Sequence, residues 1–99
     1  MFGKDMLGKL SQMQQAAEES KKRLAQIIVE GEAGGNLVVV SLNGNKEMKS
    51  VKINTDHKLM EQEDLEDLLC VAMQRALEKA TAIHDQEMMA SARNMMPGM

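Results

Sequence analysis

The sequence predicts an α+β fold with the element order α-β-β-β-α, in which two long helices flank a three-stranded antiparallel meander. Two observations carry this prediction. Apolar residues recur at helical spacing near both ends of the chain, and a central stretch rich in β-branched residues is divided by turns that contain glycine. By its length of 99 residues, the chain is expected to form one domain.

The first helix is expected from about Lys4 to Ile28. Small or apolar residues alternate there in steps of four and three, the heptad spacing of a coiled-coil seam. They are Met6, Leu10, Met13, Ala17, Ser20, Leu24 and Ile27. A helix of about 24 residues is ~36 Å long, whereas a compact domain of this size has a radius of gyration of about 13 Å. The helix should therefore extend beyond a monomeric body, and its exposed seam then needs a partner.

Three strands are expected in the middle of the chain, at Ile27–Glu32, Leu37–Leu42 and Met48–Asn54. Residues 33–36 form the first turn, and Asn43-Gly44, the strongest short hairpin signal, forms the second. The central strand is apolar on both faces, because Val39 and Val40 point in opposite directions. This pattern predicts that both faces of the sheet are covered.

The second helix is expected from about Glu61 to Arg93, where a wide apolar stripe recurs at helical spacing. Five carboxylates crowd its first turns and complement the helix dipole, namely Glu61, Glu63, Asp64, Glu66 and Asp67. Residues 95–99 include Pro97 and Gly98 and are expected to form a flexible tail. The single domain then spans residues 1–94.

The core residues available to one chain predict a homodimer. The chain has one aromatic residue and 11 methionines, so its core lacks the side chains that bury the most area. Association with a second copy is the simplest way to bury more apolar surface. The seam and the two-faced central strand place the expected dimer interface at Leu10, Met13, Leu24 and Val39.

The charge distribution leaves two interpretations open. The net charge is −3, and residues 56–99 hold nine of the 15 acidic residues. An acidic total argues mildly against a nucleic-acid partner, although a local basic patch is sufficient for contact. The run Lys21-Lys22-Arg23 lies on the first helix away from its seam. It is either an ordinary solvated surface, with Glu19–Arg23 as one helical ion pair, or half of a doubled basic cluster in a dimer.

No catalytic, cofactor or metal site is expected. His57 and His84 are far apart, and neither lies at a zinc-type spacing from Cys70, the only cysteine. We therefore expect a protein that is not an enzyme. The chain has no stretch of ~20 apolar residues and no apolar run suited to a signal peptide near its start. A cytoplasmic protein with no membrane partner is the resulting prediction.

Several segments together carry a resemblance to a known family over nearly the whole chain. They are Met1-Phe2-Gly3-Lys4, Met13-Gln14, Gly31-Glu32-Ala33-Gly34-Gly35, Leu42-Asn43-Gly44, Val51-Lys52-Ile53, Glu66-Asp67-Leu68-Leu69 with Ala72 and Ala76, and the tail with Pro97-Gly98. In this order they resemble the YbaB/EbfC family of bacterial nucleoid-associated proteins.

The resemblance implies a homodimer shaped like tweezers, with the sheets in the central body and the helices projecting as arms. It also implies binding to double-stranded DNA, a change in DNA conformation, and a role in nucleoid organisation and gene expression. The family's DNA contact is attributed to the helical arms, which here carry Lys9, Lys21, Lys22, Arg23, Arg75 and Lys79. The alternative is a protein-interaction module that uses its Met-rich arms to bind a protein partner, with DNA contact incidental.

Overall fold

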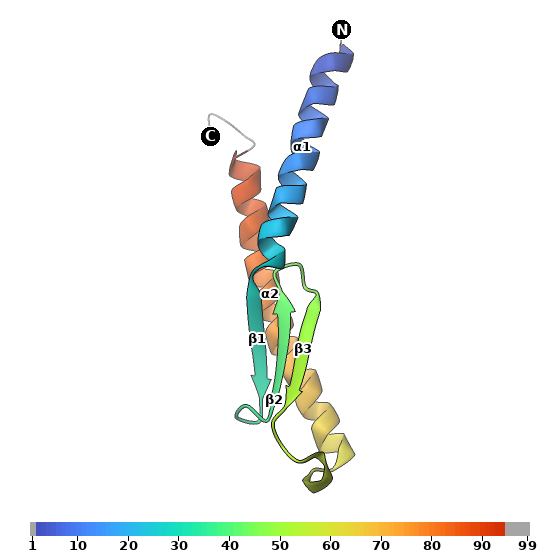
Figure 1. Ribbon diagram of the computed structural model, residues 1–99. Coiled ribbons are helices and arrows are strands. Elements are labelled where there is room, and N and C mark those ends of the chain that lie inside the picture. The colour runs from blue at the N-terminus through green and yellow to red at the C-terminus, as the bar shows by residue number, and fades with distance from the viewer. Residues whose placement is uncertain (1, 95–99) are drawn as a thin grey trace.

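The computed structural model describes residues 2–94 and has the predicted order of elements (Figure 1). The elements are α1 (Phe2–Ala25), β1 (Ile28–Ala33), β2 (Val38–Asn43), β3 (Met48–Ile53), the short 3-10 helix η1 (His57–Leu59) and α2 (Gln62–Asn94). The predicted bounds differ from these by at most three residues, and η1 was not predicted. The expected tail at residues 95–99 lies outside the described residues.

The three strands form an antiparallel sheet in the order β1-β2-β3, as the meander predicts. A register irregularity between Ser41 and Leu42 interrupts the pairing of β2 with β3. The second turn also differs from the expected Asn-Gly hairpin. Asn43 still belongs to β2, and the left-handed residue of this turn is Lys46, with a φ of 66°, rather than Gly44.

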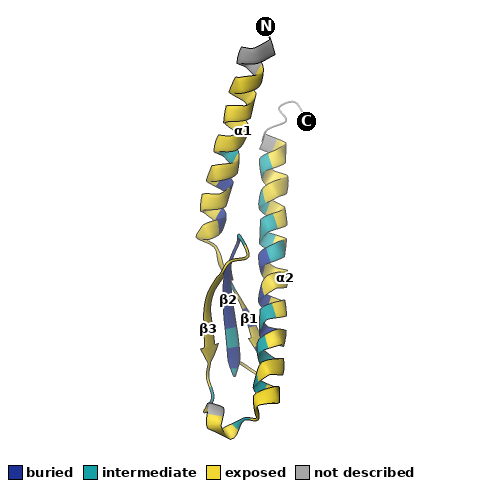
Figure 2. Cartoon of the chain, turned by 90° about the vertical axis from the view of Figure 1, so that its right-hand side faces the viewer, coloured by how far each residue is buried: buried dark blue, intermediate teal, exposed yellow. Residues whose placement is uncertain are grey.

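The core lies between one face of the sheet and α2. Alternate residues of β2 point toward the helix and are fully buried, and three small residues of α2 pack against them at helical spacing (Figure 2). The buried core consists of Ala33, Val38, Val40, Leu42, Ala72, Ala76 and Ala80. Because the α2 side chains at the contact are alanines, the helix lies very close to the strands.

The other face of the sheet is not covered by any element within the described residues. Val39 points to this face and is only half-buried, and every residue of β3 is exposed. The single chain therefore covers only one face of the sheet, and the expected cover of the other face would have to come from a second subunit. A run of valines suits two-sided burial, but it is equally compatible with a strand that has one face packed and one face open.

The molecule is elongated, with extents of 70 × 23 × 19 Å and a radius of gyration of 19.3 Å. This is well above the ~13 Å of a compact domain of this length. The beginning of α1 and the end of α2 project beyond the same end of the sheet (Figure 1). The predicted overhang of the first helix is thus confirmed, and its seam residues Met6, Leu10 and Met13 are all more than half exposed.

Candidate nucleic-acid interface

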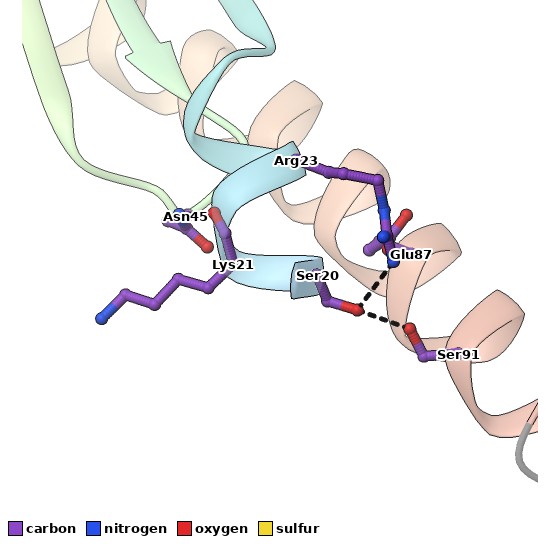
Figure 3. A network of polar contacts seen from close by, with 6 residues as sticks. All are labelled: Ser20, Lys21, Arg23, Asn45, Glu87 and Ser91. Carbon is purple, nitrogen blue, oxygen red and sulfur yellow. Dashed lines mark hydrogen bonds and ion pairs between the residues drawn. The ribbon is translucent and has the colours of Figure 1, made fainter. Parts of the chain in front are cut away.

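The two projecting helices are joined near the sheet by a small polar network (Figure 3). The Ser20 hydroxyl lies 2.6 Å from the Ser91 hydroxyl, and Ser20 is 1% exposed. The Arg23 guanidinium donates to Glu87 Oε1 at 2.5 Å through Nη2 and at 3.0 Å through Nε. This interaction chiefly lowers the pKa of the Glu87 carboxyl, and the Ser20 hydroxyl lowers it further. The helices are therefore fixed to each other at the base of the projecting arms.

The ion pair changes the interpretation of the basic run on the first helix. Arg23 points toward α2, whereas the Lys21 ammonium points away from it (Figure 3). Consecutive residues of a helix are about 100° apart around its axis, so neighbours in sequence face different surroundings. The expected Glu19–Arg23 pair is wrong, because Arg23 binds Glu87, a residue 64 positions away.

The C-terminal end of α1 is held by the turn between β2 and β3. The Gly44 N–H donates to Leu24 O at 2.9 Å, one of the last carbonyls of the helix, which lack partners inside it. The Asn45 amide donates to Lys21 O at 2.9 Å. A Cβ on Gly44 would lie 2.8 Å from Leu24 O, so only glycine allows this close approach.

Three candidate DNA-binding lysines of α1 are exposed and available. Lys9, Lys21 and Lys22 form no hydrogen bond or ion pair through their ammonium groups with any described residue. Lys9 precedes Lys21 by 12 residues, which is about 18 Å along the helix. The lysines therefore extend from the joint with the sheet onto the projecting arm.

The candidates of α2 lie elsewhere, at the free edge of β1. Arg75 Nη1 donates to Glu32 O and Lys79 Nζ donates to Glu30 O, both at 2.7 Å. These cations satisfy carbonyls that would otherwise present an open strand edge. Arg75 has four further N–H donors and Lys79 two, because guanidinium carries five and ammonium three. The structure thus does not bring the candidates of α1 and α2 into one cluster.

Between the arms lies an apolar groove of about 410 Å³. Met13 and Leu24 of α1 line one side, and Met88 of α2 lines the other. The His84 ring also borders the groove, and its Nδ1 atom is buried without a hydrogen-bond partner. The groove is mostly apolar, and Lys21 borders it together with Asn45 at the end close to the turn between β2 and β3.

The described residues include no cluster of three or more His, Cys, Asp or Glu side chains that is arranged to hold a metal ion. Cys70 is exposed, as is its neighbour Val71, although its position between Leu69 and Val71 in the sequence favours a buried residue.

No helix among residues 2–94 is both long enough and apolar enough to cross a membrane.

Comparison with known proteins identifies the family. A model of the YbaB/EbfC DNA-binding family matches residues 2–95. The chain belongs to the YbaB/EbfC DNA-binding family. This membership confirms the resemblance seen in the sequence, and it supports a DNA-binding nucleoid protein over the protein-interaction alternative. YbaB/EbfC proteins are grouped by DNA binding and are not an enzyme family.

Two relatives and one solved structure extend the comparison. A nucleoid-associated protein of Flavobacterium johnsoniae is 37% identical over 92 residues, covering 93% of this chain and 86% of the relative. A nucleoid-associated protein of Agrobacterium fabrum is 42% identical over 93 residues, with the same coverage of both chains. The crystal structure of an uncharacterized protein from Helicobacter pylori is 23% identical, with a TM-score of 0.75 over 96% of this chain and 97% of the other. This structural similarity supports the fold of the present chain and says nothing about its function.

Proposed function

We propose that this protein binds the phosphate backbone of duplex DNA as a homodimer and alters the conformation of the DNA. It would act at the nucleoid in the bacterial cytoplasm, affect nucleoid organisation and gene expression, and have no catalytic activity. The observation that carries this proposal is the set of unpaired lysines on the projecting helix α1 of a YbaB/EbfC chain. Lysine is a flexible point charge, so such contacts favour phosphate over base edges and give low sequence specificity.

The candidate residues contribute in different ways. Lys9, Lys21 and Lys22 are free to contact phosphates directly. Arg23 remains 55% exposed in its ion pair, so it adds positive charge while it holds α1 against α2. Arg75 and Lys79 anchor to β1 through one donor each, and their remaining donors face a depression bordered by Glu78. We therefore assign the primary contact to the α1 lysines and a supporting role to the α2 cations.

The homodimer is supported by apolar side chains that the single chain leaves uncovered. Leu10 and Met13 on α1 are 52% and 53% exposed, and Val39 lies on the open face of the sheet. Leu24 is 1% exposed within its own chain, so its contribution to an interface would be to support the α1 surface from beneath. A second copy would bury apolar surface and present every lysine twice, at a fixed separation.

Titration of a labelled duplex at about 50 and 200 mM salt tests DNA binding. The log–log slope of affinity against salt should be about −0.9 for each phosphate contacted. Replacing Lys21 and Lys22 by Gln should make the slope less negative by about 3.6, because two contacts are lost from each subunit of the dimer. Lys58→Glu changes the net charge by the same two units at an exposed site away from α1 and serves as the matched control. An affinity that is independent of salt, or equal slopes for the two variants, would contradict the proposal.

Light scattering in solution tests the dimer. A mass near twice 11.0 kDa at micromolar concentration is expected. Leu10→Glu should shift the mass toward the monomer without unfolding the chain, because Leu10 is 52% exposed in the subunit. The exposed neighbour Gln12→Glu should keep the mass of the dimer. A wild-type mass near 11.0 kDa at this concentration would refute the homodimer.

A further inference from the structure

The joint between α1 and the β2–β3 turn brings together lysines that are distant in sequence. Gly44 and Asn45 bind the backbone of α1, as described above, and the turn itself is held by Asn43, which is fully buried. Asn43 Oδ1 accepts from Asn45 N at 2.9 Å and from Glu47 N at 3.0 Å. The turn is therefore attached firmly to the last turns of α1, and the backbone positions from which its side chains extend are fixed relative to the helix.

Four lysines surround this joint. Lys21 and Lys22 come from α1, and Lys46 and Lys49 come from the turn and the start of β3. All four are exposed, and none of their ammonium groups forms a hydrogen bond or ion pair with a residue that the structure describes. They differ in this respect from Arg23, which is bound to Glu87.

A depression of about 300 Å³ lies between the helix and the turn. Lys21, Lys22 and Asn45 line it, together with the carboxylates Glu18 and Glu47. Glu47 is already engaged, because its Oε1 accepts from the Asn43 amide at 3.0 Å. This hydrogen bond is the main cause of the lowered pKa of Glu47, and the charges of Lys49 and Lys21 lower the pKa further. Lys21 of the helix and Lys49 of the strand therefore act on the same carboxylate. The two lysines that line the depression balance its two carboxylates, and Lys46 and Lys49 give the joint as a whole an excess of positive charge.

We propose that Lys46 and Lys49 join Lys21 and Lys22 in one binding site for successive phosphates of a duplex DNA strand, so that the hairpin contacts DNA together with the helical arm. This inference rests on the proposed DNA-binding function and adds a second structural element to the interface. A site built on a helix and an attached turn holds its charges at set positions, which favours a particular path of the backbone across the joint. Because no aromatic ring adjoins the four lysines, they would contact phosphates and would not stack on bases. Such contacts do not discriminate between base sequences.

The test compares two variants of the full-length protein in the same duplex titration. Lys46→Gln with Lys49→Gln removes the hairpin charges but keeps most of the length of each side chain. The matched control is again Lys58→Glu, which changes the net charge equally at an exposed residue of η1. Thermal unfolding is measured for both, so that a loss of fold is distinguished from a loss of contact.

The hairpin variant should lose two phosphate contacts in each subunit of the dimer, which makes the log–log salt slope less negative by about 3.6. Between 50 and 200 mM salt, wild-type affinity should then fall about 150-fold more than the affinity of this variant. The control should retain the wild-type slope. Equal slopes for the hairpin variant, the control and the wild type would overturn the hairpin site while leaving DNA binding by α1 intact. A wild-type protein that does not bind the duplex at 50 mM salt would instead overturn the proposed function.

Discussion

Gly31→Ala should strongly destabilise the fold, because β1 and α2 touch at this residue through their backbones. A Cβ built on Gly31 would lie 2.1 Å from Ala72 O and 2.3 Å from Ala76 N. Both neighbours are backbone atoms in the middle of a long helix, so neither can move aside by changing a side-chain rotamer. The added methyl group can be accommodated only if the whole helix moves away from the strand.

The magnitude follows from the size of that movement. Separations below about 3 Å are essentially never seen for a real Cβ, so α2 must move by roughly 1 Å. A gap of 0.5–1 Å forfeits about a quarter to a half of each dispersion contact, and the contacts affected include those of Ala72, Ala76 and Ala80 with the sheet. Overpacking of a core typically costs about 1–3 kcal/mol, and this backbone clash belongs at the upper end. For a domain of this size, about 3 kcal/mol lowers the melting temperature by roughly 12–24 °C.

Thermal unfolding followed by circular dichroism at a fixed protein concentration measures this effect. Gly8→Ala is the matched control, since a Cβ at Gly8 meets no atom within 4 Å and the residue lies within an exposed part of α1. The control should raise stability by about 0.5–1 kcal/mol, because alanine has the better helix propensity. A Gly31→Ala protein that melts within a few degrees of the wild type would show that α2 does not cross β1 at this distance.

Three further predictions concern the arms and the sheet edge. Leu24→Ala should cost about 2–5 kcal/mol in urea unfolding, because it leaves a cavity at the fully buried joint, whereas the exposed Leu7→Ala should change little. Glu87→Gln should destabilise the protein at neutral pH. Because the folded-state pKa of Glu87 is lowered, its contribution is complete above the ordinary value of 4.5 and disappears as the pH falls through the folded-state pKa, so the difference from wild type should shrink in acid. Replacing Arg75 and Lys79 by Leu frees the β1 carbonyls and should increase aggregation measured by light scattering, unlike Lys58→Leu.

The elements of this fold are largely encoded in local patterns. The period of the apolar residues predicts both helices, and the β-branched segments with intervening glycines predict three strands in the observed order. The overhang of α1 also follows from sequence, since it needs only a helix length and a chain length. Gly44 was predicted as a hairpin residue, but its requirement for glycine comes from contact with Leu24, which no local pattern can reveal.

Long-range pairing accounts for what the sequence alone does not predict at the candidate site. Lys22 and Arg23 are adjacent and equally basic in sequence, yet only Arg23 has a carboxylate of α2 opposite it. The attachment of Arg75 and Lys79 to backbone carbonyls of β1 likewise depends on how α2 crosses the strand. The sequence does place Lys46 and Lys49 beside a predicted turn. No local pattern, however, predicts that this turn packs against the end of α1.

The acidic total charge and the proposed contact with DNA are compatible because the charges are separated along the molecule. The carboxylates Glu61, Glu63, Asp64, Glu66 and Asp67 lie at the start of α2, at the end of the molecule opposite the projecting arms (Figure 1). From Asp67 to Glu87, which lies level with the joint, α2 rises about 30 Å. This distance is several times the Debye length of about 8 Å at physiological salt, so the acidic end contributes little to the potential at the lysines. The same separation would disfavour binding of DNA along the whole sheet, and it would direct a duplex to the end of the molecule that carries the arms.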